Sequence, residues 1–115
     1  MFMQAYQDMM EDDQTSQRSE EREMITETIN LMRASDQQPD DRVLRSKAIH
    51  LTSQLWNYFL NDLVSEENET PRELKASIIS IGIFIVKHLE RMRLEKTLAF
   101  KPVADISETI REGLN

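Results

Sequence analysis

Glycine and proline are the residues that most readily turn or break a chain, and this sequence has two glycines and three prolines among its 115 residues. Hydrophobic residues make up 39% of the chain and charged residues 30%, which is enough apolar material for one modest core. Such a composition favours long helices joined by few connections. We therefore expect an all-α protein that forms a single domain over residues 1–115.

Apolar residues recur at helical spacing in several segments. The first strong one is residues 19–35. The second begins with Asp40 or Asp41 as its N-cap and carries a stripe over roughly six turns. This stripe consists of Leu44, Ala48, Leu51, Leu55, Phe59 and Leu63. The last segment begins near Pro102 and ends near Gly113.

The third segment, residues 73–96, is rich in β-branched residues that could also form a strand. Its length and the residues before it favour a helix, because Thr70 as N-cap, Pro71 and Glu73 have the spacing of a capping box. Apolar side chains cover nearly every direction around it, so we expect it to be the central helix, packed on several sides. Gly82 would let a neighbouring helix approach closely.

These segments together predict an antiparallel bundle of four main helices. The apolar residues of Phe2–Met10 lie three and four positions apart and predict an additional short N-terminal helix. Residues 11–19 are polar without apolar periodicity and are predicted to be a loop or a frayed connection before the first strong helix. Residues 1–18 are thus the candidate mobile part of the domain.

Composition excludes several classes of function. No cysteine is present, so thiolate catalysis and disulfides are excluded, and the chain fits the cytoplasm. The apolar run at 76–86 is shorter than the roughly 20 residues that cross a bilayer, and the N-terminus lacks the pattern of a secretory signal. A net charge of −7 disfavours direct nucleic-acid binding. We expect neither a membrane nor a nucleic acid as a partner.

Catalytic and metal-binding patterns are not found. His50 and His88 stand outside any recognised metal-ligand spacing, and two glycines cannot supply a phosphate loop. Acidic pairs such as Glu20 with Glu21 lie in polar runs, which is typical of solvated faces. We therefore expect a non-enzymatic protein without catalytic residues, metal or cofactor.

Four residues are candidates for binding a protein partner: Tyr6, Trp56, Lys75 and His88. Trp56 invites this interpretation because tryptophan is enriched in interface hot spots, although its spacing from Ile49 and Leu60 is also that of a core residue. His88 would otherwise lie at the core margin with one ring nitrogen hydrogen-bonded. Tyr6 and the methionines around it could form a flap over an apolar groove, or simply pack against the bundle.

Several stretches in order along the chain resemble the FlaF family of flagellar proteins. They are AYQ at 5–7, LW at 55–56 before an acidic loop, PRELKASIISIGIFIVKHL at 71–89 and ISETIREGL at 106–114. The resemblance covers nearly the whole chain. It implies a non-catalytic regulator of bacterial flagellum biogenesis that promotes flagellin synthesis, secretion or filament assembly, alongside or opposite the translational regulator FlbT.

Two mechanisms are compatible with this resemblance. In the first, the helical protein binds flagellin as a chaperone and shelters its terminal amphipathic segments before export. In the second, it regulates flagellin mRNA after transcription by binding a protein partner of the FlbT type. Direct RNA contact would need a basic patch, and the densest one, at residues 87–96, is interleaved with Glu90 and Glu95.

Overall fold

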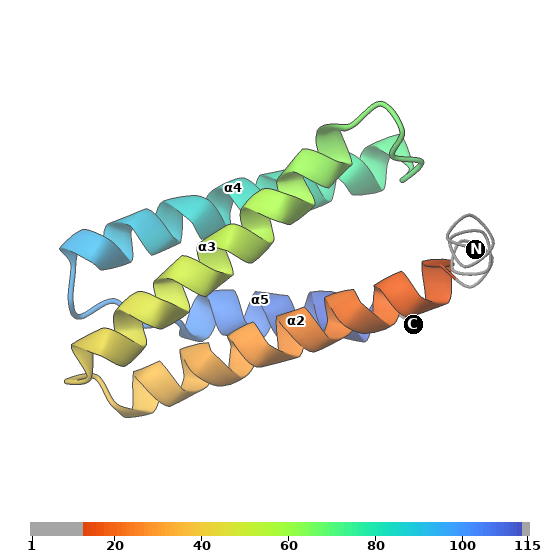
Figure 1. Ribbon diagram of the computed structural model, residues 1–115. Coiled ribbons are helices and arrows are strands. Elements are labelled where there is room, and N and C mark those ends of the chain that lie inside the picture. Colours follow the sequence, from red (N-terminus) through yellow and green to blue (C-terminus); the bar gives the residue numbers. More distant parts are fainter. Residues whose placement is uncertain (1–12, 114–115) are drawn as a thin grey trace.

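The computed structural model describes residues 13–113, with side chains from residue 19 onward, and this part of the chain contains four helices and no strand (Figure 1). Helix α2 spans Asp13–Gln37, α3 Arg42–Val64, α4 Arg72–Leu94 and α5 Lys101–Glu112. The prediction of an all-α fold with four main helices is confirmed. The short helix predicted at Phe2–Met10 lies outside the described residues.

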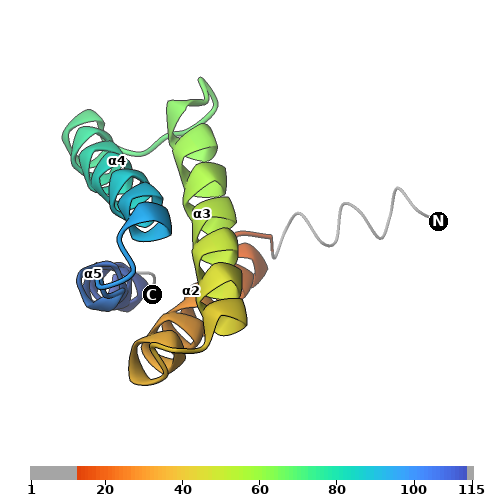
Figure 2. The same ribbon diagram turned by 90° about the vertical axis from the view of Figure 1, so that its left-hand side faces the viewer.

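Successive helices run in opposite directions, as Figure 1 shows. α2 packs against both α3 and α5, and α3 also packs against α4. α2 and α3 therefore occupy the middle of the arrangement, and Figure 2 shows α4 to one side of α3. We call the end with the α2–α3 connection and the α4–α5 loop the closed end, and the end with the α3–α4 turn the open end.

The prediction that α4 is the central helix is wrong. Ile83 and Phe84, in the middle of α4, expose 47% and 48% of their surface. Only one side of the helix is buried, through Ile85, His88 and Leu89 among others. A run of β-branched residues shows that a helix is hydrophobic all round, but it does not show how many neighbours that helix will have.

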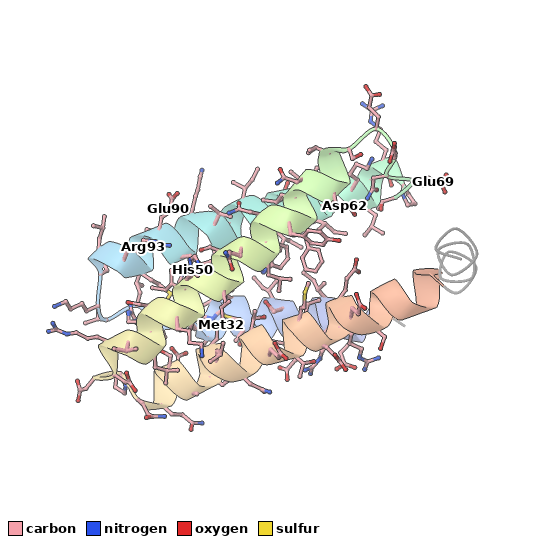
Figure 3. The ribbon with its side chains drawn as sticks, in the orientation of Figure 1. Met32, His50, Asp62, Glu69, Glu90 and Arg93 are labelled. Atoms are coloured by element: carbon pink, nitrogen blue, oxygen red, sulfur yellow. The ribbon has the colours of Figure 1, made fainter. Side chains whose placement is uncertain are left out.

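The core lies where all four helices come together, toward the closed end. Its largest fully buried side chains come from every helix and from the residue before α5: Ile25, Met32, Trp56, Ile85, Leu89, Met92, Phe100 and Val103. Figure 3 labels Met32, which points from α2 into this region. In the stripe predicted for the second helix, Ala48, Leu55 and Leu63 are buried and Leu44, Leu51 and Phe59 are half-buried, as their spacing indicates.

α2 begins earlier than predicted. The helix starts at Asp13, so the predicted loop at 11–19 is wrong from residue 13 onward. Residues 13–23 include no apolar residue, so hydrophobic periodicity could not indicate that they are helical. They also include no glycine or proline, so nothing local stops the helix.

The cap predicted for the second helix is confirmed. Asp41 is the N-cap of α3, and its side chain accepts a hydrogen bond from the backbone N–H of Leu44, with 2.9 Å between Oδ1 and N. This bond satisfies one of the amides that a helix start leaves without a partner.

The capping box predicted for the third helix is not formed. Pro71 rather than Thr70 is the N-cap of α4, and no side chain caps this end. With a ψ of 141°, Pro71 is still extended, so the helix starts at Arg72 and Thr70 lies one position too early to cap it. The backbone N–H of Thr70 instead bonds to the Asn68 side chain at 2.9 Å.

Gly82 lies at a point of close approach between α3 and α4. A Cβ atom at this position would lie 2.6 Å from Cδ2 of Leu60 and 3.1 Å from its Cγ, which is closer than van der Waals contact allows. The expectation that Gly82 admits a neighbouring helix is confirmed.

Candidate partner-binding surfaces

Trp56 is part of the core. Its side chain is 2% exposed and meets the ring of Phe59 edge-on, with centroids 5.8 Å apart. Its indole N–H has no hydrogen-bond acceptor in the described part of the chain. The core interpretation of Trp56 is confirmed, while a role in binding a partner stays a prediction that would require the ring to become accessible.

Lys75 holds the α3–α4 turn. Its ammonium group donates a hydrogen bond to the backbone carbonyl of Asn68 at 3.1 Å, and the residue is half-buried. The same turn is tightened by the side chain of Asn68, which donates to Asp62 at 3.1 Å. Lys75 therefore has a structural role in this turn. Its role in binding a partner stays a prediction.

His88 lies at the margin of the core, as expected, and is 8% exposed. Its Nε2 lies 2.8 Å from the backbone carbonyl oxygen of Ala99, so this nitrogen carries the proton and donates. The ring also lies beside Phe84, with centroids 6.0 Å apart. This bond ties α4 to the loop that leads into α5.

The candidate residues do not form one compact site. Lys75 and His88 are thirteen positions apart on α4, which corresponds to about 20 Å along the helix axis. Tyr6 lies outside the described residues. We therefore consider two surfaces, one at each end of the molecule.

At the closed end, a hollow of about 920 Å³ opens between the start of α3 and the end of α4. Arg42, Arg45, Arg93 and Lys96 line it, together with Asp36 and Asp40. Figure 3 labels Arg93 at this end. The sequence indicated a basic patch on α4, but it did not indicate that two arginines of α3 would join it.

Arg45 has a structural role within this hollow. Its guanidinium donates to the backbone carbonyls of Met92, Glu95 and Leu98, each at 3.0 Å. Asp36 accepts from the backbone N–H of Phe100 on the other side of the loop. A basic residue at position 45, in register with the buried Ile49 and Thr52, is the sequence signal that could have revealed this anchor.

Charged groups also join α2 to α5. Arg33 pairs with Asp105 at 3.0 Å and with Glu108 at 2.9 Å. The hydrogen bond from Lys101, and next the one from Arg33, hold the pKa of the Asp105 carboxyl below its ordinary value. The bond to Asp105 is also the largest cause that raises the pKa of Arg33.

At the open end, several apolar side chains next to the core are incompletely covered. We call this set the open-end face, and it consists of Phe59 and Leu60 on α3 and Leu74, Ile78 and Ile81 on α4. On α4 these residues continue, at helical spacing, the stripe that is buried from Ile85 onward. Leu74 nevertheless exposes 52% of its surface. The face is therefore an extension of the buried stripe of α4 that is only partly covered, and its residues are not isolated surface hydrophobics.

The described residues give no sign of other kinds of site. No group of three or more His, Asp or Glu residues among them is placed to hold a metal ion. No helix between residues 13 and 113 is both long enough and apolar enough to cross a membrane.

Comparison with protein-family models matches residues 2–114 to the family described as flagellar protein FlaF. No curated protein and no solved structure matches the chain. The family match covers the stretches that carried the resemblance in the sequence.

Proposed function

The chain belongs to the FlaF family of flagellar proteins, and on that premise we propose that it promotes flagellin production or assembly by binding flagellin as a chaperone. The observation that carries the proposal is a family match over nearly the whole length of the chain. The family is one of flagellar regulatory proteins and is not a known enzyme family. The proposed place of action is the cytoplasm, where flagellin is present before export.

The open-end face supports this mechanism. Helix-in-groove recognition needs apolar positions that an amphipathic helix can cover, and Leu74, Ile78 and Ile81 provide such positions on one side of α4. A chaperone for segments that would otherwise self-associate needs an apolar surface of this kind in its free state.

The hollow at the closed end favours a second candidate function. Its cationic lining is suited to an acidic partner, so regulation of flagellin mRNA through an FlbT-type protein remains an alternative. The overall charge of −7 argues against direct contact with RNA.

Isothermal calorimetry distinguishes the two functions. The full chain is titrated with flagellin monomer from the same organism and, in parallel, with the leader of the flagellin mRNA. We expect flagellin to bind with a Kd of about 1 μM or tighter and the RNA not to bind. If flagellin gives no heat and no shift in the unfolding midpoint, the chaperone proposal is wrong, and the FlbT-type regulator is then the ligand to titrate.

A further inference from the structure

The apolar stripes of the four helices differ in length. On α3 the buried apolar positions continue to Leu63, and on α4 the apolar residues at helical spacing from the buried Ile85 begin at Leu74, so both reach the open end. On α2 the buried stripe begins only at Ile25, and α5 ends at Glu112, two residues after its last described apolar residue, Ile110. Near the open end, α3 and α4 therefore present apolar residues that α2 and α5 do not match.

The first part of α2 cannot cover this surface. Residues 13–23 form three turns of helix without a single apolar side chain. Figure 1 shows that the α3–α4 pair diverges from α2 toward this end. Residues 13–23 of α2 thus offer no apolar side chain to pair with those of α3 and α4 at this end.

Charge around the open-end face is predominantly negative. Among residues 19–113, whose side chains the structure describes, the open-end half (19–27, 58–79 and 109–113) has ten acidic residues and four basic ones, whereas the closed-end half (28–57 and 80–108) has seven acidic and nine basic. Figure 3 labels two of the acidic residues, Asp62 and Glu69, at the α3–α4 turn. An occupant of the open-end face therefore gains from positive charge beside its apolar stripe.

We propose that the open-end face binds an amphipathic helix of a partner protein, with an apolar stripe of two to three turns flanked by Lys and Arg. This inference deepens the proposed function, since it assigns the surface and the chemistry by which a flagellin segment would be held. The chain's own first twelve residues are the competing occupant. They carry Asp8, Glu11 and Asp12 and no basic residue, so their charge does not complement the acidic rim.

Two synthetic peptides of 18 residues test the surface independently of flagellin. Both have the same leucine face, and one has lysine and the other glutamate on its polar face. Fluorescence anisotropy measures their binding to the full chain. We expect the Leu–Lys peptide to bind and the Leu–Glu peptide to bind at least about tenfold more weakly. Equal binding of the two peptides overturns the charge requirement.

Leu74→Asp and Leu94→Asp form a matched pair of variants. Both residues lie on α4, both are exposed, at 52% and 86%, and both substitutions add one negative charge, but only Leu74 belongs to the open-end face. We expect Leu74→Asp to weaken the Leu–Lys peptide by about tenfold and Leu94→Asp to leave it unchanged. Equal affinities of the two variants would place binding elsewhere and overturn the inference.

Further measurements separate the possible occupants. Flagellin monomer should displace the bound Leu–Lys peptide; if it binds the protein without displacing the peptide, the proposed function stands and its assignment to this face is wrong. If flagellin does not bind while the peptide discriminates between Leu74→Asp and Leu94→Asp, the face is confirmed and the proposed function fails. If the Tyr6→Asp variant binds the Leu–Lys peptide more tightly than the wild type does, the N-terminal segment is the occupant of the face. If the wild type is a dimer and Leu74→Asp is a monomer, a second copy of the chain is the occupant. Either result overturns the proposal.

Discussion

The carboxylate of Asp36, at the end of α2, accepts a hydrogen bond from the backbone N–H of Phe100, 64 positions later in the chain, at 2.8 Å. The bond serves the start of α5, where Phe100 is the N-cap and no side chain of its own provides a cap. A residue of one helix thus caps another, and the short α5 is fixed to α2 at its first turn.

Replacing Asp36 by Ala should lower the free energy of unfolding by about 1–2 kcal/mol, because the amide of Phe100 loses its acceptor in a half-buried position. Chemical denaturation measures the change. Asp40→Ala removes an exposed carboxylate from the neighbouring connection and should change stability by less than about 0.5 kcal/mol. Equal losses in the two variants would mean that the bond does not contribute.

Arg45 should not be replaceable by lysine. Its planar guanidinium reaches the carbonyl group of Met92 in the last turn of α4 and those of Glu95 and Leu98 after it, and an ammonium group cannot reproduce this fork. We expect Arg45→Ala to cost about 2–3 kcal/mol of stability and Arg45→Lys to recover less than half of that loss. Arg42→Ala, in the same hollow, is the control and should be nearly neutral. Full recovery by lysine would contradict a directional role.

Gly82 and Leu60 should be energetically coupled. Gly82→Ala gains about 1 kcal/mol of helix propensity but forces Leu60 to move, and we expect a net loss of about 1 kcal/mol. In a Leu60→Ala background the same substitution should stabilise the protein, because the obstructing atoms are gone. A double-mutant cycle by thermal or chemical unfolding gives the coupling energy, and additive effects would contradict the close contact.

Acid should weaken the α2–α5 contact through Asp105. The pKa of this carboxyl is lowered in the folded protein by its hydrogen bonds to Lys101 and then Arg33. Its contribution to stability is therefore fully present above the pKa of the unfolded chain, ordinarily 3.8, and is lost as the pH falls through the lower folded pKa.

Asp105→Asn should accordingly be less stable than the wild type near neutral pH and approach it in acid. Unfolding midpoints measured between about pH 7 and about pH 2 test this, with Glu69→Gln as the control for loss of one exposed carboxylate. High salt should shrink the difference, since the groups are largely exposed. A difference independent of pH would assign the effect to packing.

The sequence was informative where apolar periodicity and local chemistry agree. The stripe of α3 and the cap at Asp41 could be predicted because both depend on residues close in the chain. The start of α2 could not, because a polar helix has no stripe to detect. The position of α4 also could not, because its residues show that it is apolar but do not show which helices reach it.

The candidate site was harder to predict than the fold. For Trp56 and His88 the sequence left both partner binding and a place in or beside the core open, and the structure shows Trp56 in the core and His88 at its margin. The anchors at Arg45 and Asp36 depend on contacts across about 50 and 64 positions, which no local pattern contains. The open-end face depends on where the apolar residues of α2 and α5 end. It can therefore be recognised only when the positions of all four helices are known.

The uneven distribution of charge along the bundle gives the molecule an electric dipole moment. A dipole turns in the field of a charged body before any contact is made, and at physiological ionic strength this torque acts over about 8 Å from the surface. A positively charged partner would therefore meet the end with Asp62 and Glu69 first, and a negatively charged one the end with Arg93. The orientation of an encounter would then be selected during diffusion, ahead of any fit between apolar surfaces.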